Sequence, residues 1–107
     1  MPAAKQALYE AALELFQASG FDGTSVQTIV EKAGVTKGAF YYYYDSKEAL
    51  LLQMHDRLVD YALRLAEEIR AANRPPRETL IALIASQFRM VDTHLAEMTV
   101  FLQQQKH

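Results

Sequence analysis

Apolar residues recur along the chain three and four positions apart, which is the spacing of amphipathic helices rather than the alternation of strands. This pattern predicts six helices, over residues 4–19, 25–33, 37–43, 47–72, 77–92 and 95–105. The pair Pro75-Pro76 separates the fourth helix from the fifth, since proline stops one helix and can open the next. A break near Asp92-Thr93 separates the last two. The pattern therefore predicts an all-α protein.

Short polar residues and a glycine mark the ends of these helices. Thr24, with Gln27 three positions further on, has the spacing of an N-terminal capping box for the second helix. Thr36 and Ser46 are the expected N-caps of the third and fourth helices. Gly34 suits the positive φ with which the second helix is expected to end.

The first three helices can enclose a small apolar core. Its members share the inner faces of these helices: Leu8, Leu15, Phe16, Phe21, Val26, Ile29, Val30, Val35 and Phe40. Gly20 suits the left-handed conformation after the first helix, and Phe21 can then contact Phe16 as in a Schellman ending. Val35 and Phe40 have the spacing of a hydrophobic staple at the start of the third helix.

The stretch AGVTKGAFYYYYDSKEAL, residues 33–50, has the layout of a helix-turn-helix DNA reader. The turn at 33–36 is short enough to set the second and third helices at a steep angle, so that the third can enter the major groove. At about 100° per residue, the outer face of the third helix covers an arc of about 140°. That face carries Lys37, Gly38, Tyr41 and Tyr42, and Phe40 lies on the opposite side.

The residue types on this face suit DNA. Lys37 can meet a guanine edge or a phosphate, Gly38 permits close backbone approach, and a tyrosine offers its hydroxyl to phosphate and its ring to a thymine methyl. An aromatic core patch is the alternative, and it applies to Phe40 and Tyr44, because four consecutive tyrosines cannot all face inward on one short helix. Free amides at the start of the second helix favour a phosphate, although Thr24 serves there equally well as a cap alone.

Composition adds little support for DNA binding and excludes several other classes. The net charge is −2, and residues 1–48 hold four lysines and no arginine against six acids, so bulk electrostatics does not indicate a nucleic-acid partner. The absence of cysteine excludes disulfides and suits a reducing cytoplasm, and no apolar run is long enough to span a bilayer. His55 and His94 are isolated and no catalytic or nucleotide-binding motif occurs, so we expect no enzyme, no metal site and no cofactor.

The segments LYEAALELFQASGFDGTSVQTIVEKAGV and TKGAFYYYYDSKEALL, over about residues 8–51, resemble the N-terminal domain of TetR-family transcriptional repressors. The shared pieces are an A-A-x-x-L-F entry, an A-G-V turn followed by Ser or Thr, and a K-E-x-L exit. The resemblance implies DNA contacts from Ser25, Gln27, Thr36, Lys37, Gly38, Ala39, Tyr41, Tyr42, Tyr43 and Lys47. Among these, Tyr41 and Lys47 would be the phosphate anchors.

The resemblance also implies a domain plan and a function. It divides the chain into a helix-turn-helix DNA-binding domain, residues 1–46, and a partial helical ligand-binding and dimerisation domain, residues 47–107. It implies a homodimeric repressor that binds a palindromic operator and leaves it when a small-molecule effector binds, with the fourth helix carrying the signal. Asp45 departs from the family pattern and adds a negative charge near the expected phosphate, whereas Val30 and Tyr44 are departures that packing tolerates.

The alternative function is a helical dimerisation or protein-interaction module that has lost DNA binding, which the net charge and Asp45 favour. Members of the family are usually about twice as long as this chain, which indicates a truncated product or an unusual short member. Apolar faces on the later helices would then be exposed unless another chain covers them. We therefore predict a self-associated state, with exchanged helices as one form.

A second set of side chains could line an effector pocket: Tyr61, Phe88, Met90, His94, Met98 and Phe101. Core packing is the favoured alternative for this set, because apolar side chains at helical spacing usually mark a core. The segment EMTVFLQQQK, residues 97–106, resembles acyl-CoA-responsive members that control fatty-acid degradation, and it gives a hint of the effector.

Overall fold

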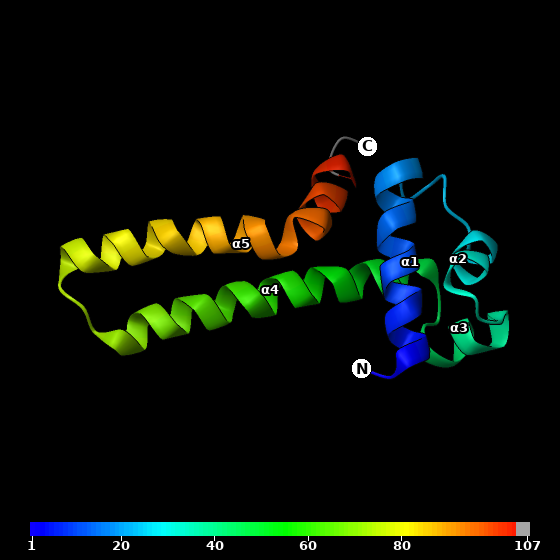
Figure 1. Ribbon diagram of the computed structural model, residues 1–107, viewed down its shortest axis with the longest axis horizontal. Helices are drawn as coiled ribbons and strands as arrows, with labels where there is room; N and C mark the ends of the chain where they lie inside the picture. Colours follow the sequence, from blue (N-terminus) through cyan, green and yellow to red (C-terminus); the bar gives the residue numbers. More distant parts are fainter. Residues whose placement is uncertain (105–107) are drawn as a thin grey trace.

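The computed structural model describes residues 1–104, and this part of the chain contains five helices (Figure 1). They are α1 (Ala3–Ser19), α2 (Val26–Ala33), α3 (Lys37–Tyr43), α4 (Lys47–Ala72) and α5 (Pro76–Gln104). The described residues form no strand, and the predicted all-α fold is confirmed. No helix of this part is both long and apolar enough to cross a bilayer.

The helices form a three-helix head and a long helical hairpin. α1, α2 and α3 make up the head, and α4 runs away from it before α5 returns antiparallel along α4 (Figure 1). The described chain measures 52 × 30 × 18 Å along its principal axes, and the hairpin accounts for its length. The last turns of α5 come back beside α1, which places the end of the hairpin against the head.

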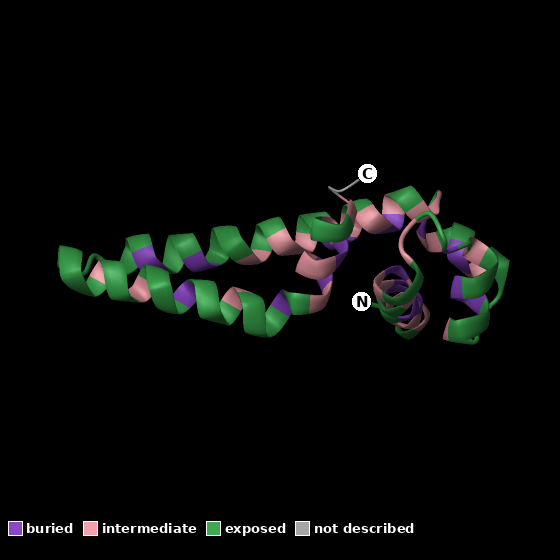
Figure 2. Ribbon diagram, turned by 90° about the horizontal axis from the view of Figure 1, so that it is seen from above, coloured by how far each residue is buried: buried purple, intermediate pink, exposed green. Residues whose placement is uncertain are grey.

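The main core lies where the head meets the start of α4 (Figure 2). Its largest fully buried side chains are Phe16, Phe40, Leu8, Ile29, Leu50 and Met54. The predicted core is confirmed, because all nine of its members are either buried or packed against this cluster. Burial of one such side chain contributes about 1.5–3 kcal/mol, and this packing holds short helices that would be marginal alone.

The N-cap of α2 differs from the predicted one. Ser25 has extended backbone angles, and its hydroxyl oxygen accepts a hydrogen bond from the Thr28 amide at 3.1 Å. In return the Thr28 hydroxyl accepts from the Ser25 amide at 3.2 Å. The predicted capping box of Thr24 and Gln27 is therefore wrong by one residue. Thr24 does not cap α2, because its buried side chain lies toward α1, where its hydroxyl donates to the Gly20 carbonyl oxygen at 2.7 Å.

The other predicted helix ends near the turn are confirmed. Thr36 caps α3 and Ser46 caps α4, since their hydroxyls accept from the amides of Ala39 and Ala49, each at 3.1 Å. Gly34 ends α2 in the left-handed conformation, with φ 72° and ψ 30°.

The end of α1 is only partly as predicted. Gly20 has a positive φ of 78°, but its ψ of 162° lies outside the left-handed helical region, so the predicted Schellman ending is wrong. The extended ψ turns the chain away from α1 immediately. Phe21 nevertheless contacts Phe16 as predicted, with ring centroids 5.2 Å apart.

The break predicted near Asp92-Thr93 is confirmed as a kink inside α5, which joins two helical segments. His94 has non-helical angles, φ −127° and ψ 29°, directly after the predicted break at Asp92-Thr93. Helical structure resumes directly after the kink, because the segment holds no glycine or proline to end it. The predicted end of the last helix at Gln105 lies outside the described residues.

Away from the head, the hairpin leaves much of its apolar surface exposed. Leu65, Ile69 and Ser86 are buried between α4 and α5. The outer face of α5 carries exposed apolar side chains, among them Leu80, Ile81, Ile84, Phe88, Val91 and Leu95. The predicted exposure of apolar faces on the later helices is confirmed.

Candidate nucleic-acid interface

α3 turns one face to the core and the other to solvent, as its helical spacing predicted. Phe40 is completely buried, whereas Tyr41 is 54% exposed and Tyr42 is 81% exposed. Lys37 and Gly38 are exposed at the start of the same helix. The structure therefore brings the four predicted reading residues together on one accessible face.

The turn before α3 sets the orientation of α3 and its exposed face relative to α2. The left-handed Gly34 lets the Val35 amide donate to the Val30 carbonyl oxygen at 3.1 Å, so the turn folds back on α2. Val35 also packs against the core. Thr36 is exposed, and its hydroxyl binds the amide of the half-buried Ala39. Backbone hydrogen bonds, a cap and one apolar contact thus set α3 against α2.

The start of α2 holds two more of the predicted contact residues. Ser25 and Gln27 are exposed, and the Gln27 amide nitrogen donates to a Glu31 carboxylate oxygen at 2.7 Å. Tyr43, at the end of α3, is half-buried, with its ring edge-on to the Tyr42 ring at 4.9 Å between centroids. These residues flank the exposed face of α3 on two elements.

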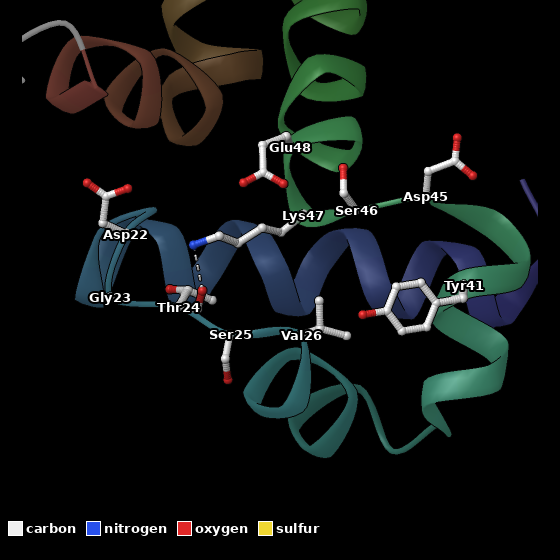
Figure 3. A pocket seen from close by; sticks show the side chains of 10 residues that line it. All are labelled: Asp22, Gly23, Thr24, Ser25, Val26, Tyr41, Asp45, Ser46, Lys47 and Glu48. Atoms are coloured by element: carbon white, nitrogen blue, oxygen red, sulfur yellow. Dashed lines mark hydrogen bonds between the residues drawn. The ribbon is translucent and has the colours of Figure 1, made fainter.

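A shallow concavity lies between the loop before α2, the end of α3 and the start of α4 (Figure 3). Its lining is Asp22, Gly23, Thr24, Ser25, Val26, Tyr41, Asp45, Ser46, Lys47 and Glu48. The Tyr41 ring extends across it from α3 toward α2 (Figure 3). The Lys47 ammonium donates to the carbonyl oxygens of Phe21 at 2.8 Å and Thr24 at 3.0 Å. It also lies 4.2 Å from the centroid of the Phe21 ring.

The charge around this concavity is mixed. Three carboxylates share its lining with the single ammonium: Asp22, Asp45 and Glu48. Elsewhere in the head, Lys32 is held by Glu14 at 3.0 Å. No ion pair between described residues involves Lys37, which is exposed. Anion binding here would therefore rest on the position of individual cations and not on a broad positive field.

Two of the predicted pocket residues lie together at the bend of α5. The rings of Tyr61 and His94 are edge-on with centroids 4.6 Å apart, and His94 is buried. Phe101 lies further along α5, where its ring contacts His55 at 5.3 Å between centroids and packs against the main core. Met98 is half-buried between these positions.

The remaining two pocket candidates lie elsewhere on the hairpin. Met90 lines a cleft of about 170 Å³ between α4 and α5, whose other lining residues are Ala62, Leu65, Ala66, Ile69, Leu83, Ser86 and Gln87. Phe88 is 72% exposed on the outer side of α5. The six predicted residues therefore do not surround one cavity in this part of the chain.

A buried polar cluster joins α1, α4 and α5, and sequence reasoning missed most of it. The Glu97 carboxylate, 7% exposed, accepts from the Tyr9 hydroxyl at 3.3 Å and lies 3.1 Å from His94 Nδ1. The Arg57 guanidinium lies over the Tyr9 ring, 4.5 Å from its centroid. Burial, and then the charge of Glu97, raises the pKa of Tyr9. The three-residue spacing of His94 and Glu97 was the only local signal.

Comparisons with known proteins agree with this architecture. The model of the family "Bacterial regulatory proteins, tetR family" matches residues 8–54. The HTH-type transcriptional regulator YerO of Bacillus subtilis (strain 168) is 34% identical over 92 residues, which are 84% of this chain and 32% of YerO. The HTH-type transcriptional repressor KstR2 of Rhodococcus jostii (strain RHA1) is 28% identical over 100 residues, or 94% of this chain and 49% of KstR2.

Structural similarity extends the match beyond the head. The solved structure of a protein named as a fatty acid metabolism regulator of Clostridium perfringens superposes with a TM-score of 0.80 and 31% identity. The superposition covers 92% of this chain and 53% of that one. This chain thus spans about a third of YerO and about half of the other two proteins. The tetR family model thus matches residues 8–54, which include the helix-turn-helix, and the hairpin superposes on a solved regulator, so the described chain has the fold of the N-terminal half of such regulators.

Proposed function

We propose that this chain reads a palindromic DNA operator as part of a homodimeric repressor, in the cytoplasm, and that a small-molecule effector releases it. The observation that carries the proposal is the exposed face of α3. Tyr41 and Tyr42 are open to solvent beside Lys37, while Phe40 anchors the helix in the core. A helix mounted in this way can present its first turns to base edges in the major groove.

The proposed contacts follow from the chemistry of the individual side chains. Lys37 meets a guanine edge or a phosphate, and the Tyr41 hydroxyl meets a phosphate. Lys47 has three ammonium protons and gives two to carbonyl oxygens, which leaves one for a phosphate. The full proposed set is Ser25, Gln27, Thr36, Lys37, Gly38, Ala39, Tyr41, Tyr42, Tyr43 and Lys47.

The proposed domain boundary lies between the three-helix head and the hairpin. We assign residues 1–46 to the DNA-binding domain and residues 47–107 to a ligand-binding and dimerisation domain. The cleft between α4 and α5, which Met90 lines, supports an effector site there. A likeness to a protein named for fatty acid metabolism supports an acyl-CoA class of effector. The exposed apolar face of α5 supports contact with further protein surface.

One observation favours the alternative, a helical interaction module without DNA binding. Asp22, Asp45 and Glu48 surround the concavity beside Lys47, and their charge would oppose a phosphate there.

A salt titration separates the two functions. A fluorescent duplex, selected from a random-sequence pool for retention by the protein, is titrated by anisotropy at several salt concentrations. For a DNA reader, the logarithm of the binding constant falls linearly with the logarithm of the salt concentration, with a slope of about −0.9 per phosphate contacted. Binding that is absent, or that does not change with salt, would support the interaction module.

A further inference from the structure

Lys47 connects two elements that are distant in sequence. It stands in the first turn of α4, and its two carbonyl partners, Phe21 and Thr24, belong to the α1–α2 loop, residues 20–25. Figure 3 shows the bond to Thr24. The ammonium also lies over the Phe21 ring at 4.2 Å, which adds a cation–π contact to the two hydrogen bonds. Three separate contacts therefore join one side chain to one short loop.

The Lys47 ammonium lies at an electrostatically unfavourable position, and its contacts with the α1–α2 loop offset this cost. The first turn of a helix carries the positive end of the helix dipole, which disfavours a lysine there by about 0.3–1 kcal/mol. Carbonyl oxygens are strong acceptors for an ammonium, and the half-buried setting strengthens such bonds. The contacts with Phe21 and Thr24 thus explain this placement without a bound anion.

The α1–α2 loop is held from its other side by α1. The Thr24 hydroxyl donates to the carbonyl oxygens of Gly20 and Leu15, at 2.7 and 3.3 Å. Gly23 lies so close to α1 that a Cβ there would collide with the Ser19 carbonyl oxygen. The loop is therefore fixed between α1 and Lys47, and it leads directly into Ser25, the N-cap of α2.

We infer that Lys47 is a positioning residue, which ties the α1–α2 loop to α4 so that the start of α2 follows any displacement of α4. A shift of α4 must either carry the loop with it or break the ammonium–carbonyl bonds. In both cases the N-cap of α2 changes its position or its order. The consequence for operator affinity rests on the proposed function, whereas the tie itself is a property of the free protein.

Hydrogen exchange in the free protein tests the tie. Lys47→Met keeps a side chain of similar length and removes all three donors. The Thr24 amide bonds to the Phe21 carbonyl oxygen and the Thr28 amide bonds to the Ser25 hydroxyl, so both report on this region. We expect their exchange to accelerate at least tenfold, while the Ala39 amide, bonded to Thr36, keeps its rate.

Lys32→Met is the matched control, because it removes a lysine of the head that pairs with Glu14 and does not touch the loop. It should leave the Thr24 and Thr28 amides unchanged. Unchanged exchange in Lys47→Met as well would overturn the inference, and Lys47 would then act only through its charge.

A measurement on the parent protein keeps the inference testable if Lys47→Met does not fold. In ¹⁵N-lysine spectra, the Lys47 ammonium should show scalar coupling across its hydrogen bonds to the Phe21 and Thr24 carbonyl carbons. Absence of this coupling, with rapid ammonium rotation, would overturn the tie. Failure of the parent to bind DNA would refute the proposed function and leave these two results unaffected.

Discussion

Replacement of Tyr9 by phenylalanine isolates one bond between the head and the hairpin. Tyr9 of α1 is 2% exposed, and its hydroxyl donates to the Glu97 carboxylate of α5. Phenylalanine keeps the buried ring and its place under the Arg57 guanidinium. The change therefore removes a single donor and leaves the apolar packing in place.

The expected loss follows from the geometry of this bond. A hydrogen bond to a charged group contributes about 1.5–3 kcal/mol. The Tyr9–Glu97 distance of 3.3 Å is long for an O–H···O bond, so the lower end applies. Tyr9→Phe should thus lower the free energy of unfolding by about 1.5 kcal/mol, which for a chain of this size lowers Tm by about 6 °C or more.

Urea unfolding followed by circular dichroism measures this loss, with an unchanged m value showing that only stability has changed. Tyr42→Phe is the control, because Tyr42 is 81% exposed and should stay within about 0.5 kcal/mol of the parent. In a Glu97→Met background, Tyr9→Phe should cost at least about 1 kcal/mol less than in the parent. Equal effects of Tyr9→Phe and Tyr42→Phe, or no coupling to Glu97, would refute this reasoning.

Three further results are expected. Lys37→Ala should weaken DNA binding, relax the base preference and reduce the magnitude of the salt slope by about 1. Tyr41→Ala should weaken binding to all duplexes alike. If both variants give the anisotropy curves of the parent, α3 does not face DNA. Gly34→Ala should lower the free energy of unfolding in urea by about 1–2 kcal/mol, because alanine is strained at a φ of 72°. A steric clash adds nothing, since a Cβ there meets no atom within 4 Å. A smaller loss would mean that the turn relaxes. Burial raises the pKa of Tyr44 from 10.0 to about 12, so the unfolded chain releases this proton first and stability falls as the pH rises through that interval. Tyr44→Phe should make the fall shallower in alkaline unfolding curves, and an unchanged slope would contradict this.

Local chemistry accounts for what could be predicted about the fold. The apolar spacing located the helices, and Gly34, Thr36 and Ser46 marked their ends, because caps and positive φ involve residues only a few positions apart. The same spacing put Phe40 inside and Tyr41 outside on α3. The exposed face of the candidate site could therefore be predicted from helical spacing alone, without any tertiary contact.

The errors arose where a tertiary contact competed with a local one. Thr24 has the sequence context of an N-cap, yet its hydroxyl turns inward to Gly20 and Ser25 takes the capping role. At Thr24, local propensity was equally good for either outcome. The predicted break near Asp92-Thr93 is present as the kink at His94, but no local signal gives the angle by which α5 turns there to pack on α1.

Short-range patterns in the chain thus specify which segments are helical, where most of them end, and which side of α3 faces outward. Two contacts depend instead on how the helices pack together: Lys47 binds carbonyl groups 23 and 26 residues earlier in the chain, and Tyr9 binds Glu97 across 88 residues. Helical periodicity acts over three or four residues, so a short segment of sequence is enough to reveal it. The partner of a buried polar group depends instead on which helices pack together, and that is settled by the apolar core as a whole.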